Sequence, residues 1–234
     1  VLATGRRAFV YLIPTYANPT GHCLGRDRAE ALLAAASSVG ITVIEDDVYR
    51  DTTPNAPASM WSVDPSNVIR LGSFSKSLSP GLRVGFLTAT PEVVATFAGC
   101  GLLDSGGGAN HVAAMLVGEM IHSGRFAEIV HGNHRRLAER RAALVEALDP
   151  AVFRFEVPSG GFFVWLRLPD GLGSDRFVDA ARADGVLVSN GRYFFAEEPS
   201  ADYVRLSFSM LDEELLREGA ASLTNTAKRL VEAG

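Results

Sequence analysis

The chain has 234 residues, of which 47% are hydrophobic and 21% are charged, and its formal net charge is −5 at pH 7. This composition is that of an ordinary globular protein and excludes a disordered chain, a collagen-like chain and a disulfide scaffold. The acidic balance argues against a general nucleic-acid binder, because neutralising phosphates requires a basic face. Every apolar run is shorter than the roughly 20 residues that span a bilayer. The two cysteines, Cys23 and Cys100, point to a reducing compartment, so we expect a cytoplasmic protein, with a single disulfide left open.

In the first part of the chain, short apolar runs alternate with helical patterns. The spacing of apolar residues predicts a helix over 26–39, which Gly40 would end, and an irregular Pro-containing stretch over 51–66. Strands are predicted at 8–13, 41–45, 67–71 and 84–89. Apolar strands that alternate with helices are typical of a mostly parallel α/β sheet.

The pattern changes after residue 90. Helices are predicted at 91–103, 109–122, 125–148, 175–184 and 212–232. Strands are predicted at 152–157, 162–168, 186–189 and 203–208, the first two joined by a turn at 158–161. Strands with short turns and flanking helices indicate a smaller α+β domain. We therefore divide the chain into residues 1–124, and residues 125–234 with a long linking helix and a small C-terminal domain.

Polar clusters follow the first three predicted strands. Their sequences are PTYANPTG at 14–21, EDDVY at 45–49, and GSFSK at 72–76 continuing to PGLR at 80–83. Each cluster alone has a structural explanation, such as a turn for Asn-Pro-Thr-Gly or a helix cap for Asp46. However, the carboxyl ends of parallel strands meet at one sheet edge, where ligands bind. The three clusters together therefore predict a functional site.

Lysine is scarce in this chain. Only Lys76 and Lys228 are lysines among the 22 basic residues. A genomic bias towards arginine accounts for the skew, but arginine stays protonated and cannot act as a nucleophilic amine. Lys76, which lies in the third cluster, is therefore a candidate for amine chemistry.

Two other kinds of site are suggested by short motifs. Ser73 to Lys76 fits the Ser-x-x-Lys pattern of penicillin-binding enzymes, but a Tyr-x-Asn element would then precede the nucleophile, which disfavours this interpretation. His131 and His134 lie one helical turn apart without a supporting carboxylate or cysteine cluster, so we expect no metal site.

Five segments, in this order, resemble the fold-type I, pyridoxal phosphate (PLP)-dependent aminotransferases of class I/II: PTYANPTG, IEDDVYR, GSFSKSLSPGLRVG, VPSGGFFVWL and YVRLSFS. The resemblance covers essentially the whole chain and is nearest to the 2-aminoadipate and kynurenine aminotransferase-like subgroup. It implies the aspartate aminotransferase type of α/β fold, with residues 1–124 as the C-terminal half of the large PLP-binding domain. It also implies a homodimeric enzyme of amino acid metabolism, which moves an amino group between an amino acid and a 2-oxo acid.

The resemblance also implies roles around the cofactor ring. Lys76 would form the Schiff base with the cofactor aldehyde and afterwards move the proton between substrate and cofactor. Asp46 would pair with the pyridine nitrogen and keep it protonated, so that the ring accepts electrons. Asp47 is the rival for this contact, but strand alternation sends neighbouring side chains opposite ways. Tyr49 and Asn18 would bond the phenolic oxygen of the ring.

The remaining implied roles concern the phosphate and the substrate. Ser73, Ser75 and Arg83 would hold the cofactor phosphate with two hydroxyls and a guanidinium group. Arg205 would bind the substrate carboxylate in a bidentate manner, assisted by Asn18.

Family members have a further segment before the first strand, which supplies part of the phosphate site and much of the dimer contact. This sequence shows no such segment, so we expect a truncated chain whose activity alone is in doubt. Two alternatives to the aminotransferase stay open. One is the PLP-binding effector domain of a winged-helix transcriptional regulator, which would contact nucleic acid only through a missing N-terminal DNA-binding domain. The other is a different PLP reaction, by a lyase or a decarboxylase, on the same fold.

Overall fold

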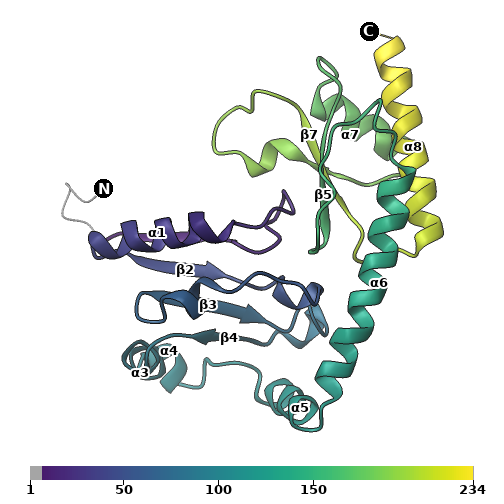
Figure 1. Ribbon diagram of the computed structural model, residues 1–234. Coiled ribbons are helices and arrows are strands. Elements are labelled where there is room, and N and C mark those ends of the chain that lie inside the picture. Colours follow the sequence, from purple (N-terminus) through teal and green to yellow (C-terminus); the bar gives the residue numbers. More distant parts are fainter. Residues whose placement is uncertain (1–6, 234) are drawn as a thin grey trace. The chain divides into compact units, whose positions relative to one another are not determined.

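The computed structural model describes residues 7–233 (Figure 1). These residues form two compact units, one of residues 7–15 and 22–134, the other of residues 16–21 and 135–233. The division falls inside the long helix α6 (Arg125–Ala147). The predicted domains also include residues 1–6 and 234, which lie outside the described residues, and their boundary after residue 124 stays a prediction.

The first unit is built on a four-stranded sheet. Its strands are β1 (Phe9–Leu12), β2 (Thr42–Asp46), β3 (Val68–Ser73) and β4 (Gly85–Thr88), in the order β1-β2-β3-β4. The first three strands are parallel and β4 pairs with β3 in the antiparallel sense. Figure 1 shows β2, β3 and β4 side by side. The predicted, mostly parallel α/β sheet is confirmed.

Helices α1 (Arg26–Ser38) and α2 (Met60–Val63) pack against this sheet. The alanine and leucine residues of α1 are good helix formers, and Leu33 and Ala36 enter a core with Val43 of β2 and Val68 of β3. The Ser59 side chain caps α2 by accepting a hydrogen bond from the Ser62 backbone. The core holds β2 and β3 in register, which fixes where their carboxyl ends lie.

The single helix predicted over 91–103 is wrong. The chain forms α3 (Pro91–Ala98) and α4 (Gly101–Asp104) instead, because glycines flank Cys100 and glycine is a poor helix former. The next helix, α5 (His111–His122), is capped by Asn110 and lies within the predicted span.

The second unit contains a three-stranded antiparallel sheet in the order β5-β7-β6. Its strands are β5 (Phe163–Arg167), β6 (Ser189–Asn190) and β7 (Tyr203–Ser207), with helices α7 (Ser174–Ala183) and α8 (Glu213–Glu232). Apolar side chains from β5, β7, α7 and α8, including the fully buried Val164, Phe177 and Val204, form one core.

The strand predicted over 152–157 is wrong as well. This segment makes one isolated bridge, between Arg154 and Arg167, and does not extend further. Pro158, which lacks a backbone N–H and cannot donate to a ladder, follows the segment. Among residues 7–233, no helix has both the length and the apolar composition that crossing a bilayer requires.

Candidate active site

The carboxyl end of β2 carries two adjacent acids that point in opposite directions. The Asp46 carboxylate accepts a hydrogen bond at Oδ2 from the hydroxyl of Tyr11 on β1. Its other oxygen, Oδ1, is buried and has no hydrogen-bond partner among the described residues. A buried carboxylate oxygen without a partner is costly unless a donor reaches it. Asp46 is therefore arranged to receive one further donor.

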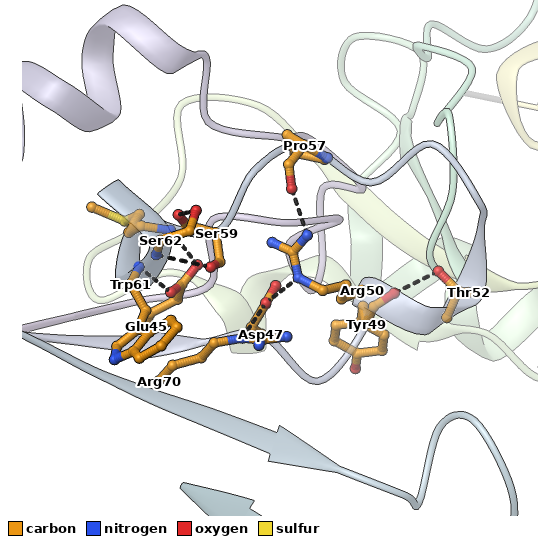
Figure 2. A network of polar contacts seen from close by, with 11 residues as sticks. Glu45, Asp47, Tyr49, Arg50, Thr52, Pro57, Ser59, Trp61, Ser62 and Arg70 are labelled. Carbon is orange, nitrogen blue, oxygen red and sulfur yellow. Dashed lines mark hydrogen bonds and ion pairs between the residues drawn. The ribbon is translucent and has the colours of Figure 1, made fainter. Parts of the chain in front are cut away.

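Asp47 is paired through Oδ2 with two arginines, as Figure 2 shows, while its Oδ1 is buried without a hydrogen-bond partner among the described residues. Its side chain is 0% exposed, and its Oδ2 accepts hydrogen bonds from Arg50 Nε and, at 2.7 Å, from Arg70 Nε. The Arg50 side chain also donates from Nη1 to the Pro57 carbonyl oxygen at 2.5 Å. These contacts tie the chain after β2 to β3 and to the 57–59 segment. Asp47 therefore holds neighbouring segments of the chain together. Its side chain points away from that of Asp46, as strand geometry predicts for adjacent residues.

Glu45 anchors the other side of the same segment (Figure 2). Its buried carboxylate accepts backbone hydrogen bonds from Met60 at 2.8 Å and from Trp61 at 2.9 Å, at the start of α2. Burial raises the pKa of Glu45, and the two backbone donors only partly oppose this effect. Glu45 and Asp47, which share a face of the strand, thus fix the backbone on both sides of Asp46.

Lys76 follows β3, the neighbour of β2 in the sheet. Its Nζ lies 5.6 Å from the centroid of the Tyr49 ring, and Lys76 as a whole is partly exposed. Tyr49 is buried, and its carbonyl oxygen accepts a hydrogen bond from Thr52 Oγ1 at 2.7 Å. The structure therefore brings together Lys76 and Tyr49, two of the predicted catalytic side chains.

The predicted phosphate-binding residues lie on the same segment as Lys76. Ser73 ends β3, and its Oγ accepts a hydrogen bond from the Ser75 backbone at 3.1 Å, which closes a tight turn. Arg83 is exposed, has φ +53°, and donates from Nη1 to the Pro80 carbonyl oxygen at 3.3 Å. This turn leaves two hydroxyls and one guanidinium group within the loop after β3.

Asn18 and Arg205 meet in the second unit. Arg205 donates from Nη1 to Asn18 Oδ1 at 2.7 Å and from Nη2 to Ser189 Oγ at 3.0 Å. Its guanidinium carbon lies 4.2 Å from the Phe163 ring centroid and 4.9 Å from the Phe194 ring centroid. Hydrogen bonds and two aromatic faces therefore hold Arg205 in one orientation.

The loop that carries Asn18 is fixed by close backbone contacts. Gly21 has φ +72°, and a Cβ there would lie 2.9 Å from Pro158 Cβ and 3.1 Å from the Phe163 carbonyl oxygen. Only glycine tolerates both the dihedral angle and this approach. This packing on the 158–163 segment explains why residues 16–21 belong to the second unit.

Tyr11, Ser189 and Phe194 belong to these contacts but stand in no motif of the sequence that points to them. Tyr11 contacts Asp46 because Tyr11 is paired with Ile44 and Asp46 is two residues further along β2 on the same face. Only the register of β1 against β2 reveals this, and no motif carries it. Ser189 lies opposite Arg205 in the β6–β7 pair, which depends in the same way on strand pairing.

No group of three or more His, Cys, Asp or Glu side chains within residues 7–233 is placed to hold a metal ion. His134, one of the two histidines one helical turn apart, contacts the backbone instead: its Nε2 lies 3.1 Å from the Asp51 carbonyl oxygen.

Comparison with known proteins places this geometry in context. The family model for aminotransferase class I and II matches residues 5–223. The 2-aminoadipate transaminase of Thermus thermophilus is 35% identical over 99% of this chain and 60% of its own length. The uncharacterized HTH-type transcriptional regulator YdfD of Bacillus subtilis is 29% identical over 96% of this chain and 47% of its own length.

A solved structure is similar throughout the chain. The α-aminoadipate aminotransferase LysN of T. thermophilus, complexed with N-(5′-phosphopyridoxyl)-L-leucine, superposes with a TM-score of 0.87 at 34% identity, covering 100% of this chain and 62% of its own. The chain thus spans less than two thirds of the length of these relatives. Since the family model matches well over half of its residues, the chain belongs to the aminotransferase class I and II family.

Proposed function

We propose that the protein to which this chain belongs is a PLP-dependent aminotransferase that exchanges an amino group between an amino acid and a 2-oxo acid. The observation that carries the proposal is the Asp46 carboxylate, of which one oxygen is held by Tyr11 while the other is buried without a partner among the described residues. Such an oxygen suits the protonated ring nitrogen of a pyridine cofactor, which is a charged donor.

The other groups of the first unit fit the rest of the cofactor. Lys76 offers an amine for the aldehyde, and the buried Tyr49 lies beside that amine at 5.6 Å from ring centroid to Nζ. Ser73, Ser75 and Arg83 offer hydroxyls and a guanidinium group for a phosphate. When bound, PLP supplies an aldehyde carbon that bonds to amines and a ring that accepts an electron pair.

The protein's own residues would act by holding and moving protons. Asp46, as an anion, stabilises a proton on the ring nitrogen. Lys76 Nζ, when neutral and not bonded to the cofactor, would take a proton from the substrate α-carbon and return it at the carbon that derives from the cofactor aldehyde, as a general base and acid. Asp47 cannot replace Asp46, because two arginines already neutralise its charge.

Arg205 is proposed to bind the substrate carboxylate. Its planar guanidinium group can donate two parallel hydrogen bonds, and Asn18, Ser189 and two phenyl rings orient it. The similarity to a 2-aminoadipate transaminase and to a structure with a phosphopyridoxyl amino acid supports this proposal. We further propose a homodimer that acts in the cytoplasm.

A PLP-binding effector domain is the second candidate, because a transcriptional regulator is among the relatives, at 29% identity. The decisive experiment uses the full-length protein loaded with PLP and a panel of amino donors with 2-oxo acids. An aminotransferase would show stoichiometric amino transfer that depends on Lys76. A regulator would bind PLP, transfer no amino group, and bind a specific DNA site through residues that precede Val1.

A further inference from the structure

The contact between Tyr11 and Asp46 links β1 to the proposed cofactor site. Tyr11 is paired with Ile44 in the parallel ladder, so its side chain and that of Asp46 emerge from the same face as diagonal neighbours. The phenol donates its hydrogen bond to Asp46 Oδ2. The hydroxyl therefore engages one oxygen of the carboxylate and leaves Oδ1 as the oxygen without a partner among the described residues.

This hydrogen bond restricts the carboxylate more than the strand alone does. Rotation of an aspartate carboxylate about its last bond is broad, so the backbone does not decide which oxygen faces a ligand. A donor fixed on Oδ2 selects one orientation. Glu45 and Asp47 hold the backbone on either side, but the hydrogen bonds of their carboxylates go to the start of α2 and to two arginines rather than to the Asp46 side chain.

Tyr11 remains a donor at all physiological pH values. Burial, followed by the hydrogen bond to Asp46 and the charge of that carboxylate, raises the pKa of Tyr11 to about 12. The phenol therefore keeps its proton and stays the donor in its hydrogen bond to Asp46 Oδ2.

We propose that Tyr11 is a positioning residue, whose hydroxyl holds Asp46 Oδ2 so that Oδ1 is presented to the ring nitrogen of the cofactor. This inference rests on the proposed function, since it concerns the same carboxylate. A purely structural role for the hydroxyl is the alternative. Tyr11→Phe removes only the hydroxyl and keeps a ring that lies on a residue 53% exposed, so the change should act on the cofactor rather than on stability.

The test uses the full-length protein with four changes: Tyr11→Phe, Asp46→Asn, the double variant, and Tyr193→Phe as the matched control. Tyr193 is 82% exposed, so removing its hydroxyl tests the chemical change without the contact. Two quantities are measured, namely the Kd for PLP and the nitrogen chemical shift of PLP labelled with ¹⁵N in the ring. The melting temperature of each variant is recorded as well.

We expect Tyr11→Phe to weaken PLP binding about tenfold, as for the loss of a hydrogen bond to a charged group. The ring-nitrogen signal should move towards that of unprotonated pyridine, in the same direction as in Asp46→Asn. Tyr193→Phe should match the wild type. Because Tyr11 acts through Asp46, its substitution should have no further effect in the Asp46→Asn background, whereas a general structural defect would be additive.

The other outcomes separate a failure of the role of Tyr11 from a failure of the proposed function. Wild-type Kd and ring-nitrogen shift in Tyr11→Phe, with both changed in Asp46→Asn, would overturn the role of Tyr11 and leave the proposed function intact. Additive effects in the double variant would overturn it too. Wild-type protein that does not bind PLP would refute the proposed function itself, and the inference with it.

Discussion

Arg205 donates a hydrogen bond to Asn18 at 2.7 Å, although the two residues are 187 positions apart in the chain. The contact joins the loop after the first strand to the sheet of the second unit, and it leaves the guanidinium group lying against two phenyl rings. Both residues were predicted from sequence as substrate-binding, and their roles stay predictions that kinetics can decide.

Replacing Arg205 by alanine should lower kcat/KM for amino acid and 2-oxo acid substrates by about 100-fold or more, mainly through KM. The reason is the loss of a charged, bidentate partner for the substrate carboxylate. Arg182→Ala, which removes an exposed arginine of α7, is the control and should change little. Steady-state kinetics with the full-length protein measure this difference. If both variants had the same kcat/KM, Arg205 would not bind the substrate carboxylate.

Removing the charge of Asp47 should destabilise the protein. In Asp47→Asn the guanidinium groups of Arg50 and Arg70, with side chains 20% and 21% exposed, lose their buried counter-ion. Breaking one side of a buried ion pair costs about 3–5 kcal/mol. Urea unfolding measures this loss.

Asp170→Asn serves as the matched control for Asp47→Asn. Asp170 is 78% exposed and pairs with Arg167 at 2.7 Å, so its loss should cost about 1 kcal/mol or less. Equal losses in the two variants would show that burial does not govern the Asp47 network.

The raised pKa of Glu45 predicts that the free energy of unfolding depends on pH. Its pKa is raised in the folded protein, mainly by burial, so the folded state holds the proton more tightly than the unfolded state. The folded protein therefore loses relative stability as pH rises from about 4.5, the reference value, through the raised pKa. The stability of the wild type minus that of Glu45→Gln should fall over this interval and level off above it. Urea unfolding of both proteins at a series of pH values gives this difference, and a flat or rising curve would contradict the expectation.

Much of the fold could be predicted from local patterns. The β-branched run at 41–45 and the helical spacing at 26–39 each predicted an element within one residue of its observed ends. The predicted strand at 152–157 failed because apolar alternation does not reveal how far a segment pairs with its neighbour, and the bridge of Arg154 to Arg167 of β5 is an isolated one. The predicted helix at 91–103 failed because its two glycines outweigh the apolar spacing.

The candidate site could likewise be predicted only in part. Strand alternation predicted that Asp46 and Asp47 point to opposite faces, and the Asp-x-x-Tyr spacing of the resemblance favoured Asp46 as the site residue. Tyr11 could not be found, because its contact with Asp46 depends on the register of β1 against β2. The packing of residues 16–21 with the second unit could not be found either, because it depends on the close approach of Gly21 to Pro158.

The most direct test of the proposed function compares the two lysines of the chain. Lys76 is proposed to bond to the cofactor, whereas Lys228 is paired with Asp149 at 2.8 Å on the surface of α8. The measurement is the visible absorption band and amino transfer of the PLP-loaded, full-length protein. We predict that Lys76→Ala loses both and that Lys228→Ala keeps both. A band and amino transfer that survive in Lys76→Ala, or that are missing from the wild type, would contradict the proposed function.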